Sequence, residues 1–142
     1  PPRSTLFPYT TLFRSTLNPG GIRIGTAEIY RQVEVVDEVS EALVIGQKWQ
    51  DDERIVLFVT LVDGCALNDE LKQKIRQQIR QNTTPHHNPK VIIAVPEIPR
   101  TLNGKIVELA VRAVVEGREI DNKEALLNPE ALGFFSNLEE LQ

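Results

Sequence analysis

The chain has 142 residues, of which 41% are hydrophobic and 25% are charged, with 16 Lys and Arg against 20 Asp and Glu. This length suits one domain with its own core and is short for an enzyme with several substrates. The net charge of -4 excludes a polyanion-binding surface. The apolar runs have at most five residues, which excludes a membrane span. The single cysteine excludes an internal disulfide and fits a reducing compartment, so we expect a cytoplasmic protein with no nucleic-acid and no membrane partner.

Residues 1–17 differ from the rest of the chain, because they contain two arginines and no acid. The segment repeats itself over a short interval, since Arg3-Ser4-Thr5-Leu6 recurs as Arg14-Ser15-Thr16-Leu17. Such a repeat is too short for a solenoid unit. Methionine is absent even at position 1. We therefore interpret residues 1–17 as a non-native or disordered segment and the chain as a fragment of a longer protein.

Residues 18–117 are expected to fold as an α+β domain with a central, mainly antiparallel three-stranded sheet flanked by helices. The domain opens with a short N-terminal β-hairpin or turn at Asn18-Pro19-Gly20-Gly21. Thr26 is expected to cap the first helix, whose apolar residues follow helical spacing. These apolar residues are Ile29, Val33 and Val36.

Two runs rich in Val, Ile, Leu and aromatic residues, 42–50 and 54–62, are joined by a polar turn and predict an antiparallel hairpin. The short strand that comes later in the chain is expected at the centre of the sheet. The remaining elements are a helix from Asn68 or Asp69, that strand over 90–95, a helix over 105–115, and a polar tail over 118–142 with helical stretches at 123–127 and 129–135.

The loop 96–105 ends in a lysine, Lys105, at the start of a predicted helix. It is not a Walker A loop, because Pro99 and Ile106 stand where that motif needs glycine and Ser or Thr. The positive end of the helix dipole disfavours a lysine there by about 0.3–1 kcal/mol, so the placement makes sense if an anion lies between them. An exposed lysine on a turn is the equally weighted alternative.

The glycine loop, residues 18–25, holds three glycines within six residues around Arg23. Paired glycines let a ligand approach the backbone closely, which suggests an anionic or slender ligand. They also simply make turns, and this second explanation is the more common one. Arg80 lies at the end of a predicted helix, where the helix dipole favours a cation without any ligand.

Three further residues have chemistry of their own. His86 and His87 are adjacent, but no Cys or carboxylate cluster lies at ligand spacing near them, so we predict no metal site. Cys65 lacks a recognisable histidine partner and is expected to be a small half-buried residue rather than a nucleophile.

Together, Gly20-Gly21-Ile22-Arg23-Ile24-Gly25-Thr26-Ala27-Glu28-Ile29 and Ile98-Pro99-Arg100-Thr101-Leu102-Asn103-Gly104-Lys105 resemble the C-terminal domain of adenylate-forming acyl-CoA synthetases. The resemblance covers residues 18–142, and the stretch 105–132 resembles the acetoacetate-activating members in particular. It implies a two-step ligase reaction. The acid and ATP first give an acyl-adenylate and diphosphate, and the thiol of coenzyme A then displaces AMP.

In that family the C-terminal domain is a mobile lid that presents a different face to each step. The resemblance assigns Lys105 to adenylation, where it reaches the substrate carboxylate and the α-phosphate region, a role in which a positioned cation stabilises developing charge. Arg23 matches an arginine directed toward the nucleotide phosphates. Gly20 and Gly21 match the edge of the pantetheine tunnel, and Arg80 matches a basic residue near the coenzyme A nucleotide.

The sequence also departs from the family pattern. The acidic hinge segment that normally precedes this region is missing, since residues 14–18 contain no acid. The large N-terminal adenylation domain, which holds the acid pocket and most ATP contacts, is expected to be the partner of this chain within one polypeptide. We expect ATP or AMP, coenzyme A and a small acid as substrates, Mg²⁺ in the parent enzyme but not on this domain, and no activity from the chain alone. The alternatives are the lid of an acetyl- or propionyl-CoA synthetase and a non-catalytic binding domain with the same fold.

Overall fold

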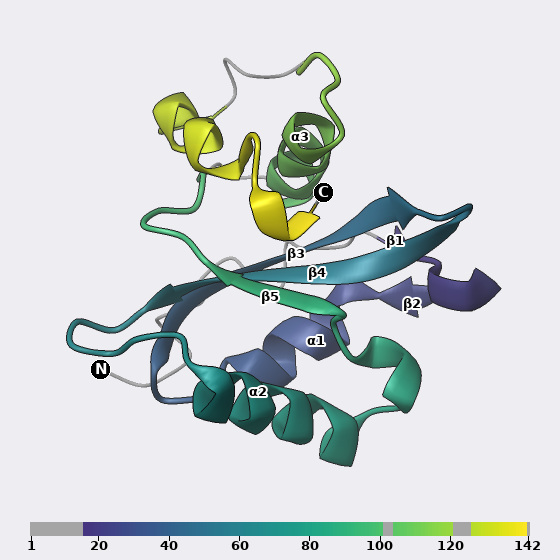
Figure 1. Ribbon diagram of the computed structural model, residues 1–142, viewed down its shortest axis with the longest axis vertical. Coiled ribbons are helices and arrows are strands. Elements are labelled where there is room, and N and C mark those ends of the chain that lie inside the picture. The colour runs from purple at the N-terminus through teal and green to yellow at the C-terminus, as the bar shows by residue number, and fades with distance from the viewer. Residues whose placement is uncertain (1–15, 101–103, 121–125, 142) are drawn as a thin grey trace.

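The computed structural model describes residues 16–100, 104–120 and 126–141, with the side chains of residues 16, 105 and 106 left out. Figure 1 shows three layers, in which α1 and α2 cover one face of a central sheet and α3 and the C-terminal turns cover the other. The elements, in chain order, are β1 (Thr16–Leu17), η3 (Pro19–Gly21), β2 (Ile24–Gly25), α1 (Thr26–Val33), β3 (Val39–Trp49), β4 (Asp52–Leu61), α2 (Asp69–Asn82), η4 (Pro85–His87), β5 (Val91–Ala94), α3 (Gly104–Val115), η6 (Pro129–Phe135) and η7 (Glu139–Leu141).

The sheet has the order β3-β4-β5. Strands β3 and β4 form the predicted antiparallel hairpin, with Lys48 opposite Glu53 next to the turn, and β5 pairs parallel to β4, with Val56 opposite Val91. The expected α+β fold is thus confirmed. The expectation that the strand over 90–95 is central was wrong, because β4 occupies the centre. Parallel strands need a crossover connection, and α2 supplies it, which leaves β5 on an edge.

The core lies on both faces of the sheet. Beneath it, α1 buries Ile29, Tyr30 and Val33, and the narrow apolar stripe predicted for α2 is buried as expected, with Ile75 and Ile79 fully so. Above it, Phe58 of β4 meets Phe135 of η6 edge-on, with ring centroids 4.7 Å apart, a geometry that aromatic pairs favour. The tail is therefore part of the core.

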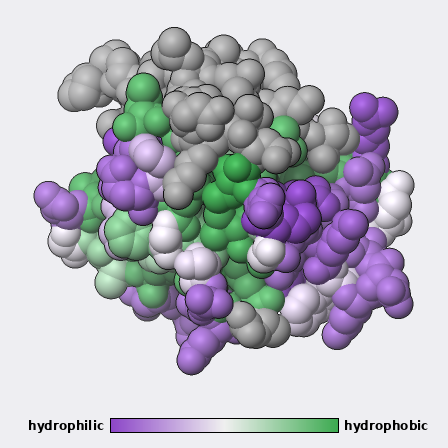
Figure 2. Space-filling view, turned by 90° about the horizontal axis from the view of Figure 1, so that it is seen from above, coloured by the Kyte–Doolittle hydropathy of each residue, from purple (hydrophilic) through white to green (hydrophobic). Residues whose placement is uncertain are grey.

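The upper face also leaves apolar side chains in solvent. Figure 2 shows this face from above, with hydrophobic groups exposed between hydrophilic ones. The exposed apolar residues of α3 and the tail include Leu109, Leu127 and Phe134.

Local structure agrees with most of the predicted element ends. Asn68 caps α2, since its Oδ1 accepts a hydrogen bond from the Leu71 amide at 2.9 Å. The helices predicted over 105–115 and 129–135 are present, the latter as a 3-10 helix. Residues 123–125 of the other predicted tail helix lie outside the described residues.

Two local expectations were wrong. Thr26 does not cap α1, because Gly25 takes the cap position with an extended backbone, and Thr26 is the first helical residue and fully buried. Cys65 is exposed rather than half-buried, since it lies in the turn that links β4 to α2.

The last two residues of the predicted segment 1–17 pair with the glycine loop. Thr16 lies opposite Gly25 and Leu17 opposite Ile24, and Leu17 is only 2% exposed. Residues 1–15 lie outside the described residues, and the domain boundaries 1–17, 18–117 and 118–142 stay predictions. Within the described ranges, no helix is both long and apolar enough to cross a bilayer.

Candidate functional site

The glycine loop is a tight turn with a left-handed backbone. Gly20 has φ of +61° and Gly21 has φ of +81°, a region that residues with a Cβ rarely adopt. The turn closes on itself through hydrogen bonds from the Gly21 amide to the Asn18 carbonyl at 3.2 Å and from the Ile22 amide to the Pro19 carbonyl at 3.1 Å. Glycine is thus required here by conformation.

Two carboxylates from β4 hold this loop by its backbone. The Asn18 amide donates to Glu53 Oε2 at 2.7 Å, and the Gly20 amide donates to Asp52 Oδ1 at 3.1 Å. The amides of Asn18, Gly20, Gly21 and Ile22 therefore already have acceptors within the protein. Of the two ligand types that the glycines suggest, this geometry favours a slender group that passes close to bare backbone.

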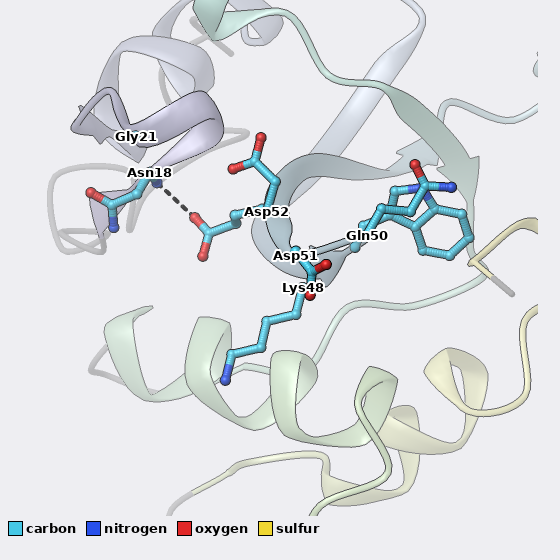
Figure 3. Close-up of a pocket in the computed structure, with 8 residues that line it drawn as sticks. Asn18, Gly21, Lys48, Gln50, Asp51 and Asp52 are labelled. Atoms are coloured by element: carbon cyan, nitrogen blue, oxygen red, sulfur yellow. Dashed lines mark hydrogen bonds between the residues drawn. The ribbon is translucent and has the colours of Figure 1, made fainter.

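A pocket of about 560 Å³ lies between the loop and the β3–β4 turn. In Figure 3, Asn18 and Gly21 border it on one side and the turn residues on the other, while Lys48 extends toward α3. A Cβ added at Gly21 would meet no atom within 4 Å, so the space in front of this residue is open. The turn residues that line the pocket are Lys48, Trp49, Gln50, Asp51, Asp52 and Glu53.

The segment that follows α2 reaches the other side of the same loop. A smaller hollow of about 270 Å³ is lined by Pro19 and Gly20 and by His86 and Lys90, which follow α2. Arg80 lies exposed in the last turn of α2, before this segment. Arg23 of the glycine loop is also exposed.

His87 belongs to this region. Its Nδ1 lies 2.8 Å from the Thr84 hydroxyl, within the 3-10 turn η4. Partial burial lowers the pKa of His87, which the charge of Glu28 opposes and that of His86 assists. The neutral imidazole is therefore favoured in the folded chain.

Lys105 lies on a different element from the glycine loop. Strand β5 runs parallel to β4 and ends with Ala94 opposite Val59, about 23 Å from the hairpin turn. Residues 95–103 separate that strand from α3, whose second residue is Lys105. The Lys105 side chain lies outside the described residues, so its predicted position at the start of a helix is confirmed for the backbone alone.

The start of α3 is fixed by a buried hydrogen-bond network. The Tyr30 hydroxyl donates to Glu108 Oε2 at 2.6 Å and accepts from the Val44 amide at 2.8 Å. Tyr30 is fully buried and Glu108 is 2% exposed. Because β3 is an edge strand, its Val44 amide needs a partner outside the sheet. Tyr30 of α1 supplies that partner and also bonds Glu108 of α3, so it connects β3 to both helical layers.

The tail fixes the segment before Lys105. Asn128 accepts from the Arg100 amide at 2.6 Å and donates to Glu97 Oε1 at 2.7 Å and to the Ile98 carbonyl at 3.2 Å. Arg100 also forms an ion pair with Glu41 at the start of β3. The loop that leads to Lys105 is thus shaped by residues from two other parts of the chain.

Of the predicted site residues, Gly20, Gly21 and Arg23 lie in one loop, Arg80 lies in the last turn of α2, and Lys105 lies in the first turn of α3. The sequence interpretation missed Glu53, Glu108 and Asn128, which hold these elements. For Glu53 the sequence contains one signal that the interpretation did not use, Gly46, since a glycine inside a strand indicates a close approach. Within the described ranges, no three His, Cys, Asp or Glu side chains are grouped so that they could hold a metal ion.

Known proteins resemble this chain in sequence and in fold. The chain is 62% identical over 128 residues to an acetoacetyl-coenzyme A synthetase of Rhizobium meliloti (strain 1021), which covers 90% of this chain and 20% of that protein. An acetoacetyl-CoA synthetase structure from Streptomyces lividans superposes with a TM-score of 0.74 at 40% identity, over 85% of this chain and 18% of that one. An anthranilate CoA ligase in complex with anthranoyl-AMP has a TM-score of 0.62 at 25% identity, over 69% and 19%.

The chain thus spans about a fifth of the length of the curated relatives it matches. The sequence profile of the AMP-binding enzyme C-terminal domain matches residues 31–105, more than half of the chain. That span begins in α1, next to the glycine loop, and ends at Lys105. The chain therefore belongs to the AMP-binding enzyme C-terminal domain family.

Proposed function

We propose that this chain is the lid of an ATP-dependent acid–CoA ligase that converts acetoacetate, ATP and coenzyme A to acetoacetyl-CoA, AMP and diphosphate through an acyl-adenylate. The observation that carries this proposal is the 62% identity to an acetoacetyl-coenzyme A synthetase over 128 residues. A match of that length within 142 residues necessarily includes both the glycine loop and the loop 96–105.

The two loops divide the reaction between them. Lys105 provides the positive charge for adenylation, at the acid's carboxylate and the α-phosphate, where negative charge develops. Arg23 provides charge for the nucleotide phosphates. Gly20 and Gly21 line the path of the pantetheine arm of coenzyme A, and Arg80 meets its nucleotide end.

The geometry supports this division in two ways. The bare backbone of Gly21 faces an open pocket, and the amides of Asn18 and Gly20 are already bonded to Glu53 and Asp52. A neutral, narrow pantetheine arm suits such a surface better than a phosphate does. Lys105 is the second residue of α3, on a different element from the glycine loop, so the two loops can serve the two steps separately.

The rest of the site lies in the partner. The adenylation domain of the same polypeptide supplies the acid pocket, most contacts to ATP and the site of Mg²⁺, and the ligase works in the cytoplasm. The isolated chain, with a charged lysine and a coenzyme A path but no acid pocket, has no ligase activity.

A chimeric enzyme tests the proposal. Residues 16–142 replace the matching fifth of the Rhizobium meliloti acetoacetyl-coenzyme A synthetase, and AMP release is measured with acetoacetate, with and without coenzyme A. The chimera should release AMP with acetoacetate in a coenzyme A-dependent manner, whereas the truncated relative and the isolated chain should not. An inactive chimera that is folded, or turnover by the isolated chain, would contradict the proposal.

A further inference from the structure

Glu53 connects three parts of the chain that are far apart in sequence. It is the second residue of β4, directly after the hairpin turn. Its Oε2 accepts the Asn18 amide of the glycine loop at 2.7 Å, and its Oε1 accepts from Arg112 Nη2 of α3 at 2.9 Å. The Glu53 side chain is 13% exposed and that of Arg112 is 23% exposed. Charge-assisted hydrogen bonds in such a half-buried setting are stronger than neutral ones.

The opposing strand makes room for this carboxylate. Gly46 lies inside β3, on the strand that pairs with β4. A Cβ at Gly46 would lie 2.6 Å from both Cδ and Oε2 of Glu53, which is closer than any real contact. Glu53 therefore reaches the Asn18 amide across a space that only glycine leaves open, and an alanine at position 46 would displace it.

The Arg112 side of the link is itself anchored. Arg112 Nε lies 3.3 Å from Oε2 of Glu116, the residue directly after α3. Burial opposes the charge of Glu116, but hydrogen bonds from Arg118 and Arg112 and the charge of Arg112 lower the pKa of Glu116 below its usual value. Arg112 is thus held between two carboxylates, and its guanidinium keeps Glu53 aimed at the loop.

We propose that Glu53 is a positioning residue for the coenzyme A step, because it ties the glycine loop to α3 and so fixes the backbone of Gly20 and Gly21. This inference rests on the proposed function. Its effect falls on one step. Asn18, which Glu53 holds, directly precedes η3 with its two glycines. Lys105 lies seven residues before Arg112 in α3, about 10 Å along the helix axis. The Tyr30–Glu108 bond holds that first part of α3 independently of Glu53.

The link itself is tested by NMR on the 142-residue chain. The amide proton of Asn18 should shift in Glu53→Gln, because its acceptor loses charge. Glu53→Gln keeps one acceptor oxygen where the link needs two, so Gly20 and Gly21 should also gain fast backbone motion. Gly46→Ala changes no charge and should have the same effect on the loop. Asp63→Asn, which removes a charge from the exposed turn that follows the far end of β4, should leave both readouts unchanged.

The functional role is tested in the chimeric synthetase. Glu53→Gln and Gly46→Ala should raise the KM for coenzyme A about 10-fold, equivalent to about 1.4 kcal/mol, and leave adenylate formation within about twofold. Asp63→Asn should behave as the parent chimera does. An Asn18 amide that is indifferent to Glu53 would overturn the link, and an equal loss in both half-reactions would overturn its assignment to the coenzyme A step. An inactive parent chimera would overturn the proposed function and this role with it, while the NMR result would still decide the link.

Discussion

At the hairpin end of the sheet, the glycine loop is held by two carboxylates that accept its amides, and the more buried of the two, Glu53, has a side chain that is 13% exposed. Near the middle of β3, the first half of α3 is held by Tyr30 and Glu108, which are 0% and 2% exposed. A buried polar group costs much more when its partner is lost than a solvated one does. The glycine loop can therefore be released without unfolding the domain, whereas the helix that carries Lys105 cannot.

The difference suits the two proposed roles. A loop that lets a slender arm pass needs an exact backbone shape but few interactions of its own, and half-exposed carboxylates supply that shape. A helix that presents a cation to a reacting carboxylate needs a fixed position, since small displacements of a catalytic group reduce the rate strongly. The buried network joins that helix to β3 and α1 and so fixes its position.

The largest expected effect comes from Tyr30→Phe. It removes the hydroxyl that donates to Glu108 and accepts from Val44, so a buried carboxylate and a buried amide lose a partner at once. We expect the free energy of unfolding to fall by about 3 kcal/mol, measured by urea denaturation of the 142-residue chain. Ser40→Ala removes one part-buried hydroxyl bond and should cost about 1 kcal/mol or less. If Tyr30→Phe cost no more than Ser40→Ala, the contrast between the half-exposed contacts of the glycine loop and the buried contacts of α3 would be wrong.

The smallest expected effect is a pH dependence at the glycine-loop end. The pKa of His87 is lowered in the folded chain, so the unfolded chain binds a proton more readily. Stability from this group is present above the unfolded pKa of about 6.5 and is lost as the pH falls through the lower folded value. Because the ring is only partly buried, the loss between pH 7.5 and 5.5 should be about 0.5 kcal/mol or less. This pH-dependent loss of stability should be absent in His87→Gln. An equal loss in that variant would mean that other groups cause it.

Local patterns predicted much of the fold. The β3–β4 hairpin, the Asn68 cap and the apolar stripe of α2 each depend on residues within one turn or one strand pair, which the sequence displays directly. The central place given to β5 failed because sheet order depends on the crossover through α2, and no residue of β5 encodes it. Thr26 is a good cap by residue type, but burial against the core decided its position.

The candidate site divides in the same way. Its glycines and Lys105 are recognisable from motifs, because backbone conformation and helix position select those residue types locally. The residues that hold them are not, since Glu53 reaches Asn18 across 35 positions, Tyr30 reaches Glu108 across 78, and Asn128 reaches Arg100 across 28. The one local sign of these contacts in the sequence is Gly46, a glycine in the middle of a strand next to Glu53.

The half-reactions of the chimeric synthetase test the central claim, that the two loops serve separate steps. Lys105→Ala should lower acetoacetyl-adenylate formation about 100-fold or more and leave thioester formation from supplied acetoacetyl-adenylate within about threefold. Gly21→Leu should do the reverse. Lys72→Ala controls for the loss of a lysine, and Gly64→Leu, at another open position with φ of +86°, controls for the strain of a side chain in a left-handed backbone. Opposite losses in the two variants, with both controls active, are the result we predict, and equal losses of both half-reactions in both variants would contradict it.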